Sequence, residues 1–327
     1  MLSVHTRAGS AMNRVVSRIS ALLLASTLIG CTVAQQDALL IKVTDMGRDK
    51  IDTQVERAQA GDVELSYLLR RAEGPAVVMV HGFSANKDAW LRFADFLPEH
   101  YTLVAPDLAG HGDSDTAESY DLEVQAERLH SLLTQLDLGP VHMVGNSMGG
   151  AISLLYASKY PQELASLTLM DSAGLDGANQ SEYFAMLEQG TNPLIATDKD
   201  SFEFRMDMVM EKPPMLPWPL RPALMRQTVE RAELNREIFA DMLATRERLA
   251  TVDFVSQIQA TVSTPTLIMW GDKDRVLDVS AVETFKQAIP DAKVHIFEGI
   301  GHVPMLEVPE DTANVIDAFI QSVPGAG

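Results

Sequence analysis

The sequence predicts an α/β fold, with a mostly parallel sheet of eight strands, helices on both faces and a helical cap inserted into the chain. Short apolar runs such as 76–80 and 164–170 fit strands that are buried on both faces. These runs alternate with helical patterns, which is typical of a parallel sheet covered on both sides. Residues 176–252 contain no strand-like run and interrupt that alternation.

Composition excludes some classes of partner. The chain has 327 residues, of which 46% are hydrophobic and 22% charged, as in ordinary globular proteins with a sizeable core. The formal net charge is −19 and no run rich in lysine and arginine occurs. Nucleic acid is therefore not expected as a partner, because phosphate binding needs a basic surface.

Residues 1–30 have the layout of an export signal. Arg7, Arg14 and Arg18 precede an apolar stretch at 19–29, which is too short to span a bilayer comfortably. The stretch ends in Leu28-Ile29-Gly30-Cys31, which resembles a bacterial lipoprotein signal. We expect cleavage before Cys31 and lipidation of its thiol.

Cys31 is also the only cysteine, so it has no partner for an internal disulfide. The lipid would hold the protein at a membrane of the bacterial cell envelope, with the outer membrane as the expected site. The alternative is ordinary cleavage after Ala34, which would release a secreted protein.

The first elements after the signal form one edge of the sheet. Residues 31–50 are predicted as a tether leading into a short helix. Residues 51–58 and 62–70 alternate apolar and polar side chains around Gly61, which predicts an antiparallel hairpin. The hairpin begins the first part of the core, at 51–175.

The remaining core elements follow from apolar runs and helical periodicity. Strands are predicted at 76–80, 102–105, 141–144, 164–170, 266–270 and 293–297. Helices are predicted at 87–97, 122–136, 151–159, 279–288 and 311–322. The last two strands belong to the second part of the core, at 253–327.

The insertion at 176–252 is predicted to be a helical cap over the strand ends, where open sheets bind ligands. Its helical stretches are 183–188, 201–210, 224–231 and 236–249, with a proline-rich bend at 213–222. Its apolar residues either pack against the core or line an acyl-chain pocket, where methionine suits varied chains. For such a pocket we single out Met210 and Trp218.

A candidate nucleophile lies in Gly145-Asn146-Ser147-Met148-Gly149, between a predicted strand and a predicted helix. A sharp strand-to-helix turn would lift the Ser147 hydroxyl clear of the sheet. The Met148 N–H at the helix start would then point where a negative oxygen forms.

An activated serine needs a base, and in this architecture the base comes last in the chain. Only His295 and His302 follow Ser147. His295 lies inside a predicted strand, whereas His302 lies in the loop beyond that strand. We therefore assign His302 as the base.

The acid should lie between the serine and the histidine. The loop after strand 266–270 offers Asp272, Asp274 and Asp278. The pattern Trp-Gly-x-x-Asp-Arg points to Asp274, with Asp272 as its main rival and Asp171 as a lesser one. Asp278 is interpreted as a helix cap.

The oxyanion hole needs two backbone donors. We assign the N–H groups of Met148 and Phe83, because Phe83 follows the strand expected beside the serine strand, and Gly82 allows close approach of a carbonyl. His81 is interpreted as a brace for this loop. No cluster with metal-ligand spacing and no phosphate-binding loop occurs, so neither a metal nor a cofactor is expected.

Several stretches together resemble the α/β-hydrolase family, and within it the lipoprotein-type bacterial triacylglycerol lipases. The stretches are 145–153, 171–174, 192–194, 209–214 and 301–305. The resemblance implies Ser147 as nucleophile, Asp274 as acid, His302 as base, a helical cap, and hydrolysis of lipid esters.

Other activities share this architecture. A carboxylesterase for short-chain esters would use the same residues. Hydrolases that cleave carbon–carbon bonds in aromatic degradation usually have tryptophan after the catalytic histidine, where this chain has Val303, a further candidate for substrate contact. A silent envelope lipoprotein that binds acyl ligands is the non-enzymatic alternative. The sequence indicates no oligomeric state.

Overall fold

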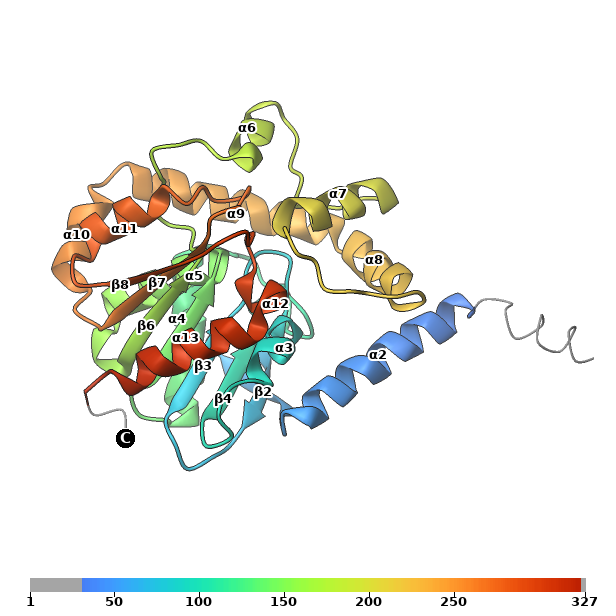
Figure 1. The fold of residues 1–327 in the computed structure, drawn as a ribbon, viewed down its shortest axis with the longest axis horizontal. Coiled ribbons are helices and arrows are strands. Elements are labelled where there is room, and N and C mark those ends of the chain that lie inside the picture. Colours follow the sequence, from blue (N-terminus) through green and yellow to red (C-terminus); the bar gives the residue numbers. More distant parts are fainter. Residues whose placement is uncertain (1–30, 325–327) are drawn as a thin grey trace, which may run out of the picture.

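A computed structural model describes residues 31–324, and it confirms the predicted α/β class with one sheet of eight strands (Figure 1). The strand order is β1-β2-β4-β3-β5-β6-β7-β8. β1 and β2 pair antiparallel, as do β2 and β4, and all other pairs are parallel. The strands are β1 (Gln54–Ala60), β2 (Val63–Arg70), β3 (Ala76–Val80), β4 (Thr102–Pro106), β5 (Val141–Asn146), β6 (Leu164–Met170), β7 (Thr266–Gly271) and β8 (Lys293–Phe297).

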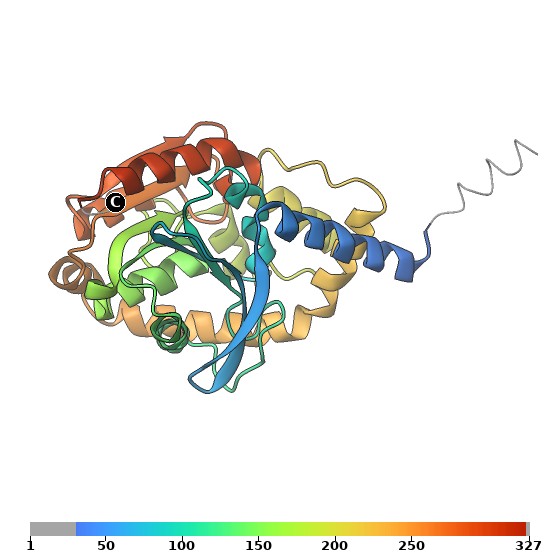
Figure 2. The ribbon, with the colours of Figure 1, turned by 90° about the horizontal axis from the view of Figure 1, so that it is seen from below.

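Helices cover both faces, so the sheet separates two hydrophobic clusters. One cluster lies under α4 (Leu122–Leu136), α5 (Met148–Lys159), α10 (Phe254–Thr261) and α11 (Ala281–Ala288). The other lies under α3 (Leu91–Ala94), α12 (Pro304–Glu307) and α13 (Pro309–Gln321). In Figure 2 the sheet is seen between the red helix α13 and the green helices α4 and α5. β3 to β7 are mostly apolar because side chains on both of their faces are buried.

The strand order places a site at the middle of the sheet. The chain passes from β3 to β4 on one side and then returns to β5 on the other side of β3. Such a reversal opens a crevice at the carboxyl ends of the strands. The segments that follow β3 and β5, which contain Phe83 and Ser147, both lie at this crevice.

Helices inserted between β6 and β7 lie above or to the side of these strand ends in Figure 1. They are α6 (Glu182–Glu188), α7 (Lys199–Val209), α8 (Leu220–Glu230) and α9 (Ala232–Ala250). The proline-rich bend joins α7 to α8. Within it Met215 is 91% exposed and Trp218 is 60% exposed, so this segment runs over the surface.

Several elements differ from the prediction, and α12 was not predicted. The predicted tether is the 18-residue helix α2 (Val33–Lys50), which starts at a capping box formed by Thr32 and Gln35. It has no buried residue, so it lacks the apolar stripe by which a long packed helix is recognised in a sequence. α10, capped by Asp253, was not predicted. The predicted helix 87–97 is a 3₁₀ turn (Lys87–Trp90) followed by the short α3.

The export signal at 1–30 lies outside the described residues. Cys31 is described and directly precedes α2, which extends away from the sheet in Figure 1. Within residues 31–324, no helix is both long enough and apolar enough to cross a bilayer.

Candidate active site

Ser147 occupies a strained turn between β5 and α5. Its φ is 57° and its ψ is −121°, a conformation that non-glycine residues rarely adopt. The two glycines of the motif have no room for a side chain. A Cβ on Gly145 would lie 2.4 Å from the Gly149 carbonyl oxygen, and one on Gly149 would lie 2.2 Å from that of Val80. Any side chain at either position would clash with the neighbouring backbone, so this turn requires glycine on both sides of Ser147.

His302 and Asp274 form a buried pair after β8 and β7. His302 Nδ1 lies 2.7 Å from Asp274 Oδ2. Asp274 Oδ1 accepts the N–H groups of Val276 at 2.7 Å and Leu277 at 2.9 Å, so the carboxylate is fixed by its own loop. With the Nδ1 proton facing Asp274, Nε2 of His302 is left as the acceptor that a general base needs.

The end of the serine strand is tied directly to the histidine loop. Asn146 Nδ2 donates to the carbonyl oxygen of His302 at 3.1 Å and to that of Met170 at 3.2 Å. Ser147 Oγ makes no hydrogen bond within residues 31–324, and it is partly accessible. Bonds between nucleophile and base are often long before substrate binds. The structure therefore places Ser147, His302 and Asp274 at one edge of the sheet.

The rival carboxylates have other partners. Asp272 Oδ1 accepts the Gly299 N–H at 2.6 Å, which fixes the loop after β8. Asp278 accepts the Ser280 N–H at 2.9 Å, next to the start of α11, close to the predicted capping role. Asp171 lies at the end of β6, where its Oδ1 accepts the Gly271 N–H at 2.9 Å. Of the four candidates, Asp274 is the one whose carboxylate faces His302.

Asp171 is a third buried group beside the pair. Its side chain is fully buried, and Oδ2 has no hydrogen-bond partner. Burial, together with the neighbouring Asp274, raises the pKa of Asp171 well above its ordinary value. Ligand atoms of Asp171, Asp274 and His302 lie within 4.8 Å of one another. The 2.7 Å contact between His302 and Asp274 is a hydrogen bond and leaves no space for an ion between those two atoms.

The loop that contains Phe83 lies against the serine turn. A Cβ on Gly82 would be 3.0 Å from Ser147 Cβ, so the loop approaches the nucleophile closely. His81 Nδ1 donates to the Gly82 carbonyl oxygen at 2.8 Å, and its Nε2 accepts the Leu108 N–H at 3.1 Å. Burial lowers the pKa of His81, which keeps the imidazole neutral and able to fill both roles.

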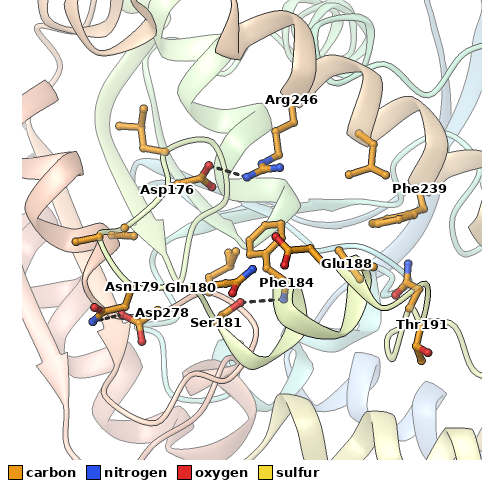
Figure 3. Close-up of a pocket in the computed structure, with 18 of the residues that line it drawn as sticks. Asp176, Asn179, Gln180, Ser181, Phe184, Glu188, Thr191, Phe239, Arg246 and Asp278 are labelled. Carbon is orange, nitrogen blue, oxygen red and sulfur yellow. Dashed lines mark hydrogen bonds and ion pairs between the residues drawn. The ribbon is translucent and has the colours of Figure 1, made fainter.

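A cavity of about 680 Å³ lies under the cap (Figure 3). Its apolar wall comes mainly from α6, α9 and the loop after Asp274, and includes Phe184, Leu187, Phe239, Leu243 and Leu277. Arg246, also on α9, is paired with Asp176 at 2.7 Å and lies 4.6 Å from the Phe184 ring centre. Ser147, His302 and Phe83 do not line this cavity, which lies beside the loop of Asp274 through Leu277, whose N–H donates to Asp274 Oδ1. A volume of this size suits a small ligand or an acyl chain.

The predicted pocket residues lie elsewhere. Met210 is buried at the end of α7, and neither it nor Trp218 lines the cavity. Val303 packs against the second hydrophobic cluster. The residues that line the cavity have no local signature, since α6 and α9 are about fifty positions apart and are brought together by the fold.

Comparison with known proteins gives three findings. A family model described as the α/β-hydrolase fold matches residues 75–309. Lipase 3 of Moraxella sp. (strain TA144) is 36% identical over 308 residues, which cover 91% of this chain and 96% of that lipase. Monoacylglycerol lipase ABHD6 of Homo sapiens is 30% identical over 84% of this chain and 85% of its own length.

Among solved structures, a membrane phospholipase A described as a bacterial virulence factor superimposes with a TM-score of 0.83. It is 36% identical, and the match covers 96% of this chain and 99% of that one. The chain is therefore similar to lipid ester hydrolases over nearly all of its described length.

Proposed function

The chain belongs to the α/β-hydrolase family, and from this we propose that it is a serine hydrolase that cleaves carboxylic esters of lipids. The observation on which the proposal depends is the buried His302–Asp274 pair beside the strained Ser147 turn. The lipase relatives, with 36% identity over 91% of the chain, support a lipid ester as substrate.

The reaction follows from the positions of these groups. Ser147 Oγ attacks the ester carbonyl carbon while His302 Nε2 takes the hydroxyl proton. The N–H groups of Phe83 and Met148 bind the oxygen that becomes negative. The ester C–O bond then breaks, and His302 returns the proton to the departing alcohol. Water attacks the acyl-enzyme in the same way, which releases the carboxylic acid and restores Ser147.

Removing the nucleophile tests this assignment. We expect Ser147→Ala to lower kcat by roughly 10³-fold or more without changing the unfolding temperature, because the hydroxyl makes no hydrogen bond to residues 31–324. The measurement is hydrolysis of p-nitrophenyl esters of graded chain length, an emulsified triacylglycerol and a phosphatidylcholine. Ser131→Ala, on α4 far from the site, is the matched control and should keep full activity.

The substrate panel separates the alternatives. Activity confined to short soluble esters would identify a carboxylesterase. A Ser147→Ala enzyme that keeps its activity would refute the nucleophile. Failure of the wild-type chain to react with a serine-directed phosphonate would point to an acyl-binding lipoprotein without catalysis.

We further propose that the protein is exported and held at a bacterial envelope membrane by lipid on Cys31. The proposal is supported by the three arginines, the apolar stretch 19–29 and the sequence Leu28-Ile29-Gly30-Cys31. The position of Cys31 before α2, which extends away from the sheet, is compatible with an anchor that leaves the active site free (Figure 1).

A further inference from the structure

Ser84, the residue after the proposed oxyanion donor Phe83, is held by three separate side chains. Its N–H donates to His111 Nε2 at 3.4 Å, and its carbonyl oxygen accepts from Arg205 at 3.2 Å. Its hydroxyl oxygen accepts from Asn235 Nδ2 at 3.0 Å. Ser84 has a φ of 57°, so its backbone is strained and depends on such contacts to keep its conformation.

Two of these three partners belong to the cap. Arg205 lies on α7 and Asn235 on α9. Phe239, one helical turn after Asn235 on the same face of α9, packs its ring 5.8 Å from the ring of Phe83. The cap therefore contacts both Phe83 and Ser84, and within residues 31–324 the core adds one side-chain hydrogen bond to Ser84, from His111 in the loop after β4.

Asn235 is buried and Arg205 is partly buried, and each has a buried polar atom without a hydrogen-bond partner in residues 31–324. Asn235 is 1% exposed, and its Oδ1 has no hydrogen-bond partner. Arg205 Nε is also buried without a partner, and no carboxylate in residues 31–324 forms an ion pair with this guanidinium. Burial lowers the pKa of Arg205 to about 10. Within residues 31–324, each of these side chains makes its hydrogen bond to the core through Ser84.

α7 also reaches the other half of the site. The carbonyl oxygen of Val209, at the end of this helix, accepts the His302 N–H at 3.0 Å. Arg205 is one turn earlier in the same helix. A single cap helix thus contacts the loop of the base and the loop of the oxyanion hole, and a shift of α7 would disturb both.

We propose that Arg205 and Asn235 are positioning residues that hold Ser84, and through it the Phe83 N–H, so that the oxyanion hole is complete only when the cap is seated on the core. This inference rests on the proposed serine-hydrolase function. It makes the cap part of the catalytic geometry in addition to being a cover for the substrate. Because the oxyanion exists only in the transition state, these residues act on kcat and leave KM unchanged.

The experiment compares Asn235→Ala, Arg205→Met, Arg205→Lys and Ser84→Ala on a short soluble ester. Removal of a whole oxyanion donor costs roughly 10²–10³-fold in kcat. We expect a loss of about 10-fold or more for Asn235→Ala and Arg205→Met, with KM within about twofold. Affinity for a boronic acid, which forms a tetrahedral adduct on Ser147, should fall by the same factor. Arg205→Lys, which keeps a cationic donor, should recover part of the loss.

Arg236→Ala is the matched control, because Arg236 neighbours Asn235 on α9 but pairs with the exposed Glu233. The double variant Ser84→Ala/Asn235→Ala separates positioning from general damage. Both changes remove one and the same hydrogen bond, so the double variant should lose no more activity than the worse single variant.

Additive losses in this cycle would overturn the proposal, as would unchanged boronate affinity or a change confined to KM. Thermal unfolding is measured for each variant. If Asn235→Ala or Arg205→Met does not fold, Arg205→Lys and Ser84→Ala still test the proposal. Failure of the proposed function is a separate result, since it appears in the wild type and in Ser147→Ala.

Discussion

At the residue scale, backbone strain gathers at the proposed active site. Five non-glycine residues in the described chain have positive φ, and three of them are Ser84, Ser147 and Asp171. These three residues follow β3, β5 and β6, which are consecutive strands of the sheet, so all three lie at its carboxyl edge. Strained conformations persist where many surrounding contacts fix them, and they are common at functional sites. The three residues place the oxyanion donor, the nucleophile and a buried acid.

The buried carboxyl of Asp171 predicts a pH-dependent stability. Its pKa is raised in the folded state, so between its ordinary value of 3.8 and that raised value the unfolded chain loses a proton that the folded chain keeps. This group therefore lowers the free energy of unfolding as pH rises. Asp171→Asn removes the effect and can still accept the Gly271 N–H. We expect the variant to gain stability at pH 8 relative to wild type, and to gain much less at pH 4.5.

Urea unfolding at the two pH values measures this difference. Asp291→Asn, an exposed acid, is the control and should leave the pH dependence unchanged. Equal pH dependence in wild type and Asp171→Asn would show that the pKa of Asp171 is not raised in the folded state. Esterase activity should remain within about fivefold, because a neutral amide resembles the protonated acid and Asp274 still faces His302.

At the element scale, the loop after β4 supports the oxyanion loop through a buried ion pair. Asp107 Oδ2 lies 2.6 Å from Lys87 Nζ, and its Oδ1 accepts the Lys87 N–H at 2.7 Å. Lys87 Nζ also contacts Asp113 at 2.6 Å. A Cβ on Gly112 would lie 2.1 Å from Asp107 Oδ2, which is why glycine occupies that position. Burial opposes the charge on Lys87, but the two carboxylates outweigh it and raise its pKa.

Breaking this pair should destabilise the whole fold. Lys87→Met leaves the fully buried Asp107 without its cation, and such a loss costs roughly 3–5 kcal/mol. Lys50→Met, which removes an exposed partner of Asp95, should cost no more than about 1 kcal/mol. Chemical denaturation of both variants measures the contrast. Equal free energies of unfolding would mean that the network around Asp107 tolerates the missing charge.

At the scale of the whole molecule, the chain is strongly acidic, with a formal net charge of −19. Cleavage before Cys31 would remove Arg7, Arg14 and Arg18 and no acids, so the net charge would change from −19 to −22. A surface this negative does not favour contact with anionic lipids. Membrane attachment, as proposed, therefore depends on the lipid at Cys31.

Replacing the cysteine tests the anchor. Cys31→Ala should prevent incorporation of labelled fatty acid and move esterase activity from the membrane fraction to the soluble fraction, with its specific activity retained. Mass spectrometry of the wild-type protein should find a lipid-modified Cys31 at the mature amino terminus. An unmodified terminus at Gln35 would identify the secreted form instead.

Much of the fold is readable from the sequence because its signals are local. The predicted strand 164–170 and helix 122–136 coincide with β6 and α4, since periodicity reports which face of a segment is buried. The length of α2 was underestimated, since residues 31–50 were predicted as a tether leading into a short helix and no residue of α2 is buried. The Ser147 turn was equally readable, because glycines are required within two residues of the serine.

Tertiary structure alone decided which groups meet. Asp272 and Asp274 share one loop, and only the backbone path of that loop shows which carboxylate faces His302. Ser84 and Asn235 are 151 positions apart, and neither belongs to a recognisable motif. The sequence by itself determined the sheet, the nucleophile turn and the order of serine, acid and histidine. Long-range packing, which local patterns do not encode, decides which acid faces His302. It also forms the cavity and the hydrogen bonds between the cap and Ser84.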